Sequence, residues 1–128
     1  MEVVKRRRDL REKIIEEAKD WSAKLPLKLT AILIGSYARG DFNLWSDVDI
    51  MLISEDFTGG PIQRLKPLDI LPGYQVIPLT PNEFRSLLAR KNPLATDVIE
   101  HGIVLRDDLG VRQIPRLKAY DSAARVSP

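Results

Sequence analysis

The spacing of apolar residues separates helical from extended stretches along this chain. Between residues 9 and 24 the apolar positions recur every three or four residues, which places them on one side of a helix. Those positions, together with the residue that follows the helix, are Leu10, Ile14, Ala18, Trp21 and Leu25. Asp9 is placed to cap the start of this helix, Glu12 completes a capping box, and Pro26 ends it.

Four short apolar runs predict strands. Residues 29–34 and 48–53 are nearly continuous apolar runs, as expected of buried strands. Residues 75–79 predict a third strand, in which Pro78 cannot donate a ladder hydrogen bond and therefore marks a sheet edge or a strand end. Residues 103–106 predict a last short strand.

Two consecutive helices are predicted before that last strand. Thr80 has the position of an N-cap, and Glu83 completes a capping box around a proline at the first helical position. A second helix start follows at Asn92, again with proline next, and Gly102 ends the helix. The single histidine, His101, falls in the last turn, where it complements the helix dipole in a structural role.

The order of these elements predicts one α+β (mixed α/β) domain, in which a small mixed sheet has its helices packed on one side. The length of 128 residues fits a single domain. We expect the domain to span residues 1–110. Residues 111–128 have only weak periodicity and are predicted to be a C-terminal tail or a partner-docking segment.

Composition restricts the chemistry of any site. The chain has no cysteine and one histidine, which excludes disulfides, thiolate metal sites and His-rich metal centres. A metal would have to be held by carboxylates, which favours Mg²⁺ or Mn²⁺ over zinc. No apolar run approaches membrane-spanning length and no signal-like stretch follows the basic N-terminus, so we expect a cytoplasmic protein without membrane contact. Many charged residues and few amides favour a thermophilic source.

A basic run at residues 5–8 has two interpretations. It is either a nucleic-acid-binding arm, or a solvated lead-in to the first helix or a disordered tip. The second interpretation is favoured, because the run is short and no aromatic stacking platform adjoins it. Nucleic acid is therefore not an expected partner.

The segment from residue 34 to residue 50 concentrates groups suited to phosphate. A buried strand ends there at Gly35, whose missing side chain lets the backbone approach a ligand closely. Ser36 adds a hydroxyl and an amide at the start of a short helix, where the backbone N–H groups favour an anion. A simple capping role is the alternative for Ser36.

Asp47 and Asp49 stand two residues apart at the start of the next strand. That spacing directs both carboxylates to the same side. Two like charges so close favour a cation between them. Mg²⁺ bound by one or two carboxylates together with substrate phosphates fits this arrangement.

Gly35-Ser36, ten residues and then Asp47-x-Asp49 resembles the signature of the DNA polymerase β-type nucleotidyltransferase superfamily. The fuller string Gly-Ser-Tyr-Ala-Arg-Gly-Asp followed by Ser-Asp-Val-Asp resembles the minimal nucleotidyltransferases of archaea and bacteria, most strongly over residues 29–54. The resemblance implies that Gly35 and Ser36 contact the triphosphate of an NTP, with ATP as the expected nucleotide. Asp47 and Asp49 would be catalytic and would hold Mg²⁺.

The same resemblance implies a reaction and a partner. A nucleoside monophosphate would pass from the NTP to an acceptor hydroxyl with release of pyrophosphate. Members of this family often pair with a small helical protein of the HEPN type, which the nucleotidyltransferase modifies or masks as an antitoxin. The family also places a third carboxylate, a metal ligand and base, on a later strand.

This chain departs from the family at that third carboxylate. Anchoring the comparison on Leu79-Thr80-Pro81 places Gln75 where an acid is expected. Gln75 is a poor base, and loss of a general base costs roughly 10²–10⁴-fold in rate. Asp69 would substitute only if the strand were offset. Two hypotheses follow: a nucleotidyltransferase, or a catalytically weak or inactive module that binds nucleotide or partner.

Four further residues near the signature have open roles. Arg39 either reaches the triphosphate or pairs with Asp41. Ser46 either orients Asp47 in a nucleotide-binding role or is an ordinary loop residue. Trp45 is expected to pack rather than to stack on a base. Tyr37 follows the phosphate turn, a position that is compatible with exposure.

Overall fold

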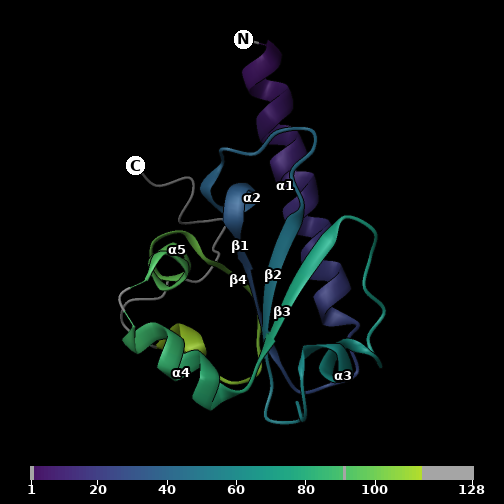
Figure 1. Ribbon diagram of the computed structural model, residues 1–128. Helices are drawn as coiled ribbons and strands as arrows, with labels where there is room; N and C mark the ends of the chain where they lie inside the picture. Colours follow the sequence, from purple (N-terminus) through teal and green to yellow (C-terminus); the bar gives the residue numbers. More distant parts are fainter. Residues whose placement is uncertain (1, 91, 114–128) are drawn as a thin grey trace.

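The computed structural model describes residues 2–90 and 92–113, which form a mixed sheet with helices around it (Figure 1). The elements in chain order are α1 (Glu2–Ala23), β1 (Thr30–Ile34), α2 (Gly35–Arg39), β2 (Val48–Ile53), α3 (Pro61–Leu65), β3 (Tyr74–Leu79), α4 (Pro81–Ala89), α5 (Pro93–His101), β4 (Ile103–Asp107) and the 3₁₀ turn η1 (Val111–Gln113). Most of the predicted C-terminal tail, residues 114–128, lies outside the described residues. None of the helices in the described ranges is long and apolar enough to cross a membrane.

The strands lie in the order β3-β2-β1-β4. β1 runs antiparallel to both of its neighbours, whereas β2 and β3 run parallel to each other. The predicted mixed sheet is therefore confirmed. Pro78 lies in β3, which is an edge strand, so its missing N–H leaves no gap inside the sheet.

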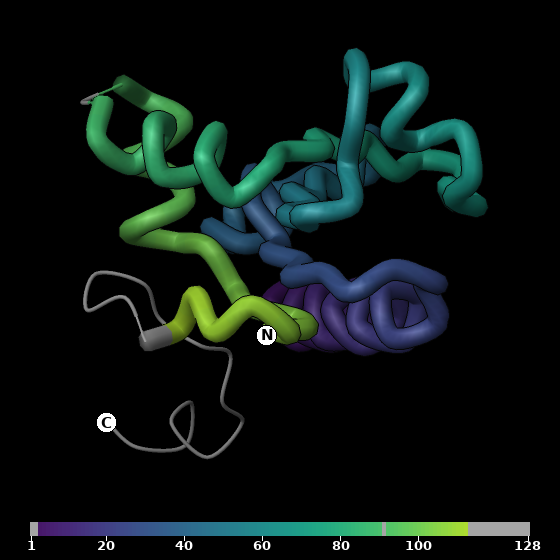
Figure 2. Tube along the Cα trace, turned by 90° about the horizontal axis from the view of Figure 1, so that it is seen from below, coloured from purple at the N-terminus to yellow at the C-terminus, as the bar shows by residue number. Residues whose placement is uncertain are grey.

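Helices cover both faces of this sheet, and the prediction that they pack on one side was wrong. Leu33 and Ile50 belong to one apolar cluster with Ile15 of α1, whereas a second cluster, around Met51 of β2, includes Val98 of α5. Figure 2 shows α1 on one side of the strands and α4 and α5 on the other. The continuous apolar runs of β1 and β2 are the pattern of strands buried on both faces.

The first helix begins at Glu2, seven residues before the predicted cap at Asp9. Asp9 lies inside α1 and does not cap it, because residues 5–8 are good helix formers that extend the helix upstream. The basic run therefore lies in the helix itself, rather than in a lead-in before it or in a disordered tip. Arg7 from this run donates to the carbonyl of Phe42 at 2.7 Å, and Arg11 donates to the carbonyls of Tyr37 and Ala38, each at 2.7 Å.

The caps predicted for α4 and α5 are confirmed. The Thr80 hydroxyl accepts from the amide of Glu83 at 3.2 Å, and the Glu83 carboxylate accepts from the amide of Thr80 at 2.9 Å. The Asn92 side chain accepts from the amide of Ala95 at 2.8 Å. These caps fix where α5 begins, and α5 carries a residue of the candidate site.

Candidate active site

The turn between β1 and α2 is built around Gly35. This residue has φ of +76°, in the region that favours glycine. A Cβ added there would collide with the carboxylate of Asp49, so the absence of a side chain is what lets the turn lie directly on that acid. Gly40 ends α2 with φ of +93°, and its amide donates to the carbonyl of Ser36 at 2.7 Å. The structure therefore shows a close approach of Gly35 to Asp49, and the approach of Gly35 to a ligand stays a prediction.

Ser36 is partly exposed in the first turn of α2. The N-cap position of α2 belongs to Ile34, and no side chain caps the helix. The interpretation of Ser36 as a simple N-cap was therefore wrong, since Ser36 stands after the cap position.

Asp47 and Asp49 lie at the start of β2. Asp47 is exposed just before the strand, and Asp49 is partly buried against Gly35. Asp49 alternates with Val48 and Ile50, whose side chains pack on the α1 side, so its carboxylate faces the other side of the sheet.

The electrostatics of Asp49 fit a cation. Burial raises the pKa of the Asp49 carboxyl above its usual range, and the charge of Asp47 raises it further. Arg39 acts in the opposite direction, and the charge of Asp97 adds a smaller increase. A divalent cation would relieve both the desolvation and the repulsion of the two acids. Within residues 2–90 and 92–113, no three acidic, histidine or cysteine side chains already converge as a metal-binding group.

Gln75 is the register partner of Asp49 on the parallel strand β3, and it is exposed. Paired residues of neighbouring strands share a face, so an amide side chain stands beside Asp49 at this position. Asp69 lies in the loop between α3 and β3, as predicted. Its carbonyl accepts from the indole N–H of Trp21 at 2.7 Å, and it lines a cavity of about 700 Å³ beside α1. Asp69 is therefore on the α1 side of the sheet, away from Asp49.

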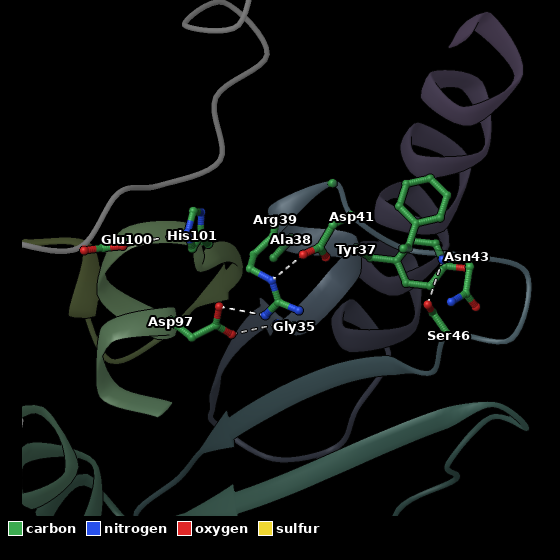
Figure 3. A network of polar contacts seen from close by, with 12 residues as sticks. Gly35, Tyr37, Ala38, Arg39, Asp41, Asn43, Ser46, Asp97, Glu100 and His101 are labelled. Carbon is green, nitrogen blue, oxygen red and sulfur yellow. Dashed lines mark hydrogen bonds and ion pairs between the residues drawn. The ribbon is translucent and has the colours of Figure 1, made fainter. Parts of the chain in front are cut away.

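Asp97 of α5 is a member of the site that the sequence analysis missed. One of its carboxylate oxygens accepts from the amide of Gly35 at 3.0 Å, and the other accepts from Nη1 of Arg39 at 2.9 Å (Figure 3). The relevant pattern was present in the sequence. Asp97 stands three residues after Leu94 and directly before Val98, so an acid adjoins the apolar side of a predicted helix.

Arg39 is held by two carboxylates. Its Nε donates to Asp41 at 3.1 Å, so the predicted pair with Asp41 is confirmed, and Asp97 is a second partner. The hydrogen bond to Asp97, and then the one to Asp41, raises the pKa of the Arg39 guanidinium. Contact between Arg39 and a triphosphate stays a prediction.

The loop from residue 41 to residue 47 is closed by its own polar groups. The Ser46 hydroxyl accepts from the amide of Asn43, and the Asn43 side chain accepts from the amide of Trp45, each at 2.8 Å. Ser46 therefore closes the turn that leads into Asp47. Trp45 is 90% exposed and Leu44 is 83% exposed, so the expected packing role of Trp45 was wrong.

Tyr37 is buried, so the exposure that its position allowed is not found. Its ring stacks on Phe42 with the centroids 4.5 Å apart, and the guanidinium of Arg7 lies over the other ring at 4.6 Å. The signature helix α2 is thereby packed against α1. His101 is the last residue of α5, in agreement with its predicted position in the final turn. Its Nε2 lies 3.8 Å from Oε2 of Glu100.

Comparison with known proteins gives a family and a fold. A family model described as a nucleotidyltransferase domain matches residues 11–114, most of the chain. A crystal structure of a presumed nucleotidyltransferase from Sulfolobus solfataricus is similar, with a TM-score of 0.51 and 16% sequence identity over 81% of this chain and 86% of the other. At that identity the likeness concerns the fold. No curated protein matches the chain.

Proposed function

Since this chain belongs to the nucleotidyltransferase domain family, we propose that it binds an NTP with Mg²⁺ and transfers a nucleoside monophosphate to an acceptor hydroxyl. The observation that carries this proposal is the contact of Gly35 with Asp49. It brings the turn suited to phosphate and the pair of acids into one site, although the two motifs are separated along the chain.

Each residue has a distinct role in this proposal. Asp47 and Asp49 hold Mg²⁺, which neutralises triphosphate charge when bound. Gly35 and Ser36 contact the phosphates from the turn between β1 and α2. Arg39 adds a positive charge at the end of α2.

The chemical step exchanges the phosphoanhydride bond between the α- and β-phosphates for a phosphoester bond to the acceptor. The acceptor oxygen forms a bond to the α-phosphorus while the bond from that phosphorus to the β-phosphate oxygen breaks. Pyrophosphate leaves, and the hydroxyl proton passes to a carboxylate or to solvent. Such reactions depend mainly on positioning and charge stabilisation, which suits a site of two acids and a close-packed turn.

The proposed nucleotide is ATP, and the proposed acceptor is a small helical partner protein of the HEPN type. Modification of that partner would give the chain an antitoxin role in the cytoplasm. The proposed source is a thermophile, in line with the high content of charged residues and the few amides.

Transfer is tested with NTPs labelled at the α-phosphate. Each of the four NTPs is incubated with the full chain, Mg²⁺ and the protein encoded beside it. We expect label on the partner with ATP, and no label with Asp49→Asn. Asp56→Asn, an exposed acid in the loop after β2, is the matched control and should label normally. If no NTP binds to the wild-type chain and none labels an acceptor, the proposal fails.

A second function is favoured by one observation, the neutral Gln75 beside Asp49. In this alternative the chain binds nucleotide or partner but turns over weakly or not at all. Partner neutralisation would then survive the replacement of both Asp47 and Asp49 by alanine. Gln75→Asp separates the two functions, because it should raise the rate if a third acid at this position is all that is missing.

A further inference from the structure

We propose that Asp97 is a positioning residue of this site, which acts by holding both ends of α2 from the neighbouring helix α5. This inference rests on the proposed function. Asp97 does not need to touch the substrate. It keeps the turn at Gly35 in place against Asp49, so that the phosphate-binding groups and the acids stay in a fixed relation.

The two hydrogen bonds of Asp97 define this role. Gly35 is the first residue of α2 and Arg39 is the last, and one carboxylate accepts from both, at 3.0 Å and 2.9 Å. Only 16% of the Asp97 side chain is exposed, so these charge-assisted bonds are partly shielded from water. Figure 3 shows the carboxylate between the Gly35 backbone and the Arg39 guanidinium.

A helix as short as α2 needs such external support. Five residues cannot form a stable helix by themselves, because nucleation fixes several dihedral angles for very few hydrogen bonds. Arg11 supports α2 at the carbonyls of Tyr37 and Ala38. Asp97 is the side chain that reaches the amide at the other end, where Gly35 lies on Asp49.

The backbone of Gly35 also needs a hydrogen bond from outside α2 to hold its conformation. Glycine visits many backbone conformations, so its positive φ is not enforced by its own side chain. The bond from its amide to Asp97 selects the conformation in which Asp49 fits against the turn.

The helix that carries Asp97, α5, is held in place by a cap and by buried side chains. Asn92 caps the start of α5, Ala95 and Val98 are buried, and Val98 belongs to the apolar cluster on this face of the sheet. Asp97 therefore transmits the position of α5, and of the sheet beneath it, to the two ends of α2.

The test compares Asp97→Asn with Asp41→Asn in the full chain. Both changes remove a carboxylate that pairs with Arg39, but only Asp97 also accepts from Gly35. Isothermal titration with ATP and Mg²⁺ should show a dissociation constant raised about tenfold in Asp97→Asn, as expected for loss of a charge-assisted pair. Asp41→Asn should change it less than twofold.

A second readout does not depend on nucleotide. Hydrogen exchange of the Gly35 amide, followed by NMR in labelled protein, should accelerate at least tenfold in Asp97→Asn and stay unchanged in Asp41→Asn. Asp97→Glu, which keeps the charge on a longer side chain, should recover part of the wild-type nucleotide affinity and of the slow Gly35 exchange. It replaces Asp97→Asn in the test if Asp97→Asn folds poorly.

The outcomes separate this inference from the proposed function. Unchanged Gly35 exchange in both Asp97 variants would overturn the positioning role. Faster exchange with unaltered nucleotide affinity would also overturn it, since Asp97 would then only support the fold. A wild-type chain that binds no nucleotide would refute the proposed function, and Gly35 exchange would still decide whether Asp97 holds the turn.

Discussion

Two separate conditions at the position of Gly35 disfavour any side chain. Its φ is +76°, and Asp49 fills the space that a side chain would need. Gly35→Ala should lower the free energy of unfolding by roughly 1–3 kcal/mol for the backbone alone. The collision with Asp49 adds to that loss and should weaken nucleotide binding at least tenfold. Chemical unfolding and ATP titration measure the two effects.

Gly110→Ala is the matched control for this substitution. Gly110 has nearly the same φ, +77°, but open space where a Cβ would lie. It therefore carries the backbone penalty without a collision and should leave nucleotide binding unchanged. Equal losses of stability and binding in the two variants would show that the contact with Asp49 has no effect on the site.

Residue by residue, local motifs in the sequence named candidate site residues but did not reveal all of their contacts. The positions of Gly35, Ser36, Asp47 and Asp49 followed from local motifs. Asp97 could not be placed, because its contact with Gly35 spans 62 residues and depends on how α5 lies on the sheet. Trp45 was assigned the wrong exposure, since a local pattern does not reveal which loop aromatic finds a neighbour.

Among the elements, α4 gives a prediction that depends on pH. The Arg64 guanidinium, together with the Thr80 amide, lowers the pKa of Glu83 from 4.5 to about 2. An acid whose pKa is lowered by folding stabilises the protein above its unfolded pKa, and this contribution is lost as the pH falls through the folded value. Glu83→Gln should therefore be less stable than wild type at pH 7, and the difference should shrink between pH 4.5 and about 2.

Thermal unfolding across this pH range measures the effect. Thr80→Ala gives the scale for the rest of the capping box, since loss of an N-cap side chain costs about 1 kcal/mol. A difference in melting temperature between Glu83→Gln and wild type that is constant with pH would contradict the assigned ion pair with Arg64. In that pair, Nη1 of Arg64 lies 2.5 Å from Oε1 of Glu83.

The loop from residue 41 to residue 47 combines a buried anchor with an exposed tip. Phe42 is 3% exposed and stacks on Tyr37, so Phe42→Ala should cost roughly 3–5 kcal/mol. Trp45 is 90% exposed, so Trp45→Ala should change stability by less than about 0.5 kcal/mol. Urea unfolding distinguishes these values. A large loss in Trp45→Ala would mean that its ring packs against the protein in solution.

For single helices and strands, sequence patterns predicted the features that depend on neighbouring residues. The caps of α4 and α5 and the limits of β2 followed from the sequence because each depends on a few adjacent residues. The start of α1 was misplaced because its upstream turns have good helix propensity, and the helix extends past the only strong cap candidate.

For the molecule as a whole, the placement of the layers explains how the site is held. α1 supports α2 from one side through Arg11 and the loop after α2 through Arg7, and α5 supports α2 from the other side through Asp97. The sequence predicted a mixed sheet, but it did not predict that the helices lie on both faces. That arrangement depends on contacts between distant segments, and it is what brings α5 to the end of β1.

The proposed cation site needs the ionised form of the Asp49 carboxyl, whereas folding favours its neutral form. Burial and the nearby Asp47 raise the pKa of its carboxyl, so the ionised form is less favourable in the folded chain than in the unfolded chain. An acid whose pKa is raised by folding stabilises the protein at low pH, and stability falls as the pH rises above the unfolded value of 3.8. Asp49→Asn, which removes the charge with little change in size, should therefore raise the melting temperature at pH 7 in the absence of Mg²⁺ and nucleotide.

The same substitution should abolish stabilisation by ligand. Ligand at a hundred times its dissociation constant stabilises a folded protein by about 2.7 kcal/mol, so Mg²⁺ with ATP should raise the melting temperature of the wild type clearly. Asp49→Asn should show no such rise, although it starts from a higher melting temperature, and the exposed-acid control Asp56→Asn should behave like wild type in both conditions. A lower melting temperature of Asp49→Asn than of wild type, both without ligand, would mean that the Asp49 carboxylate stabilises the fold. A carboxylate that serves a ligand is instead expected to destabilise the ligand-free protein.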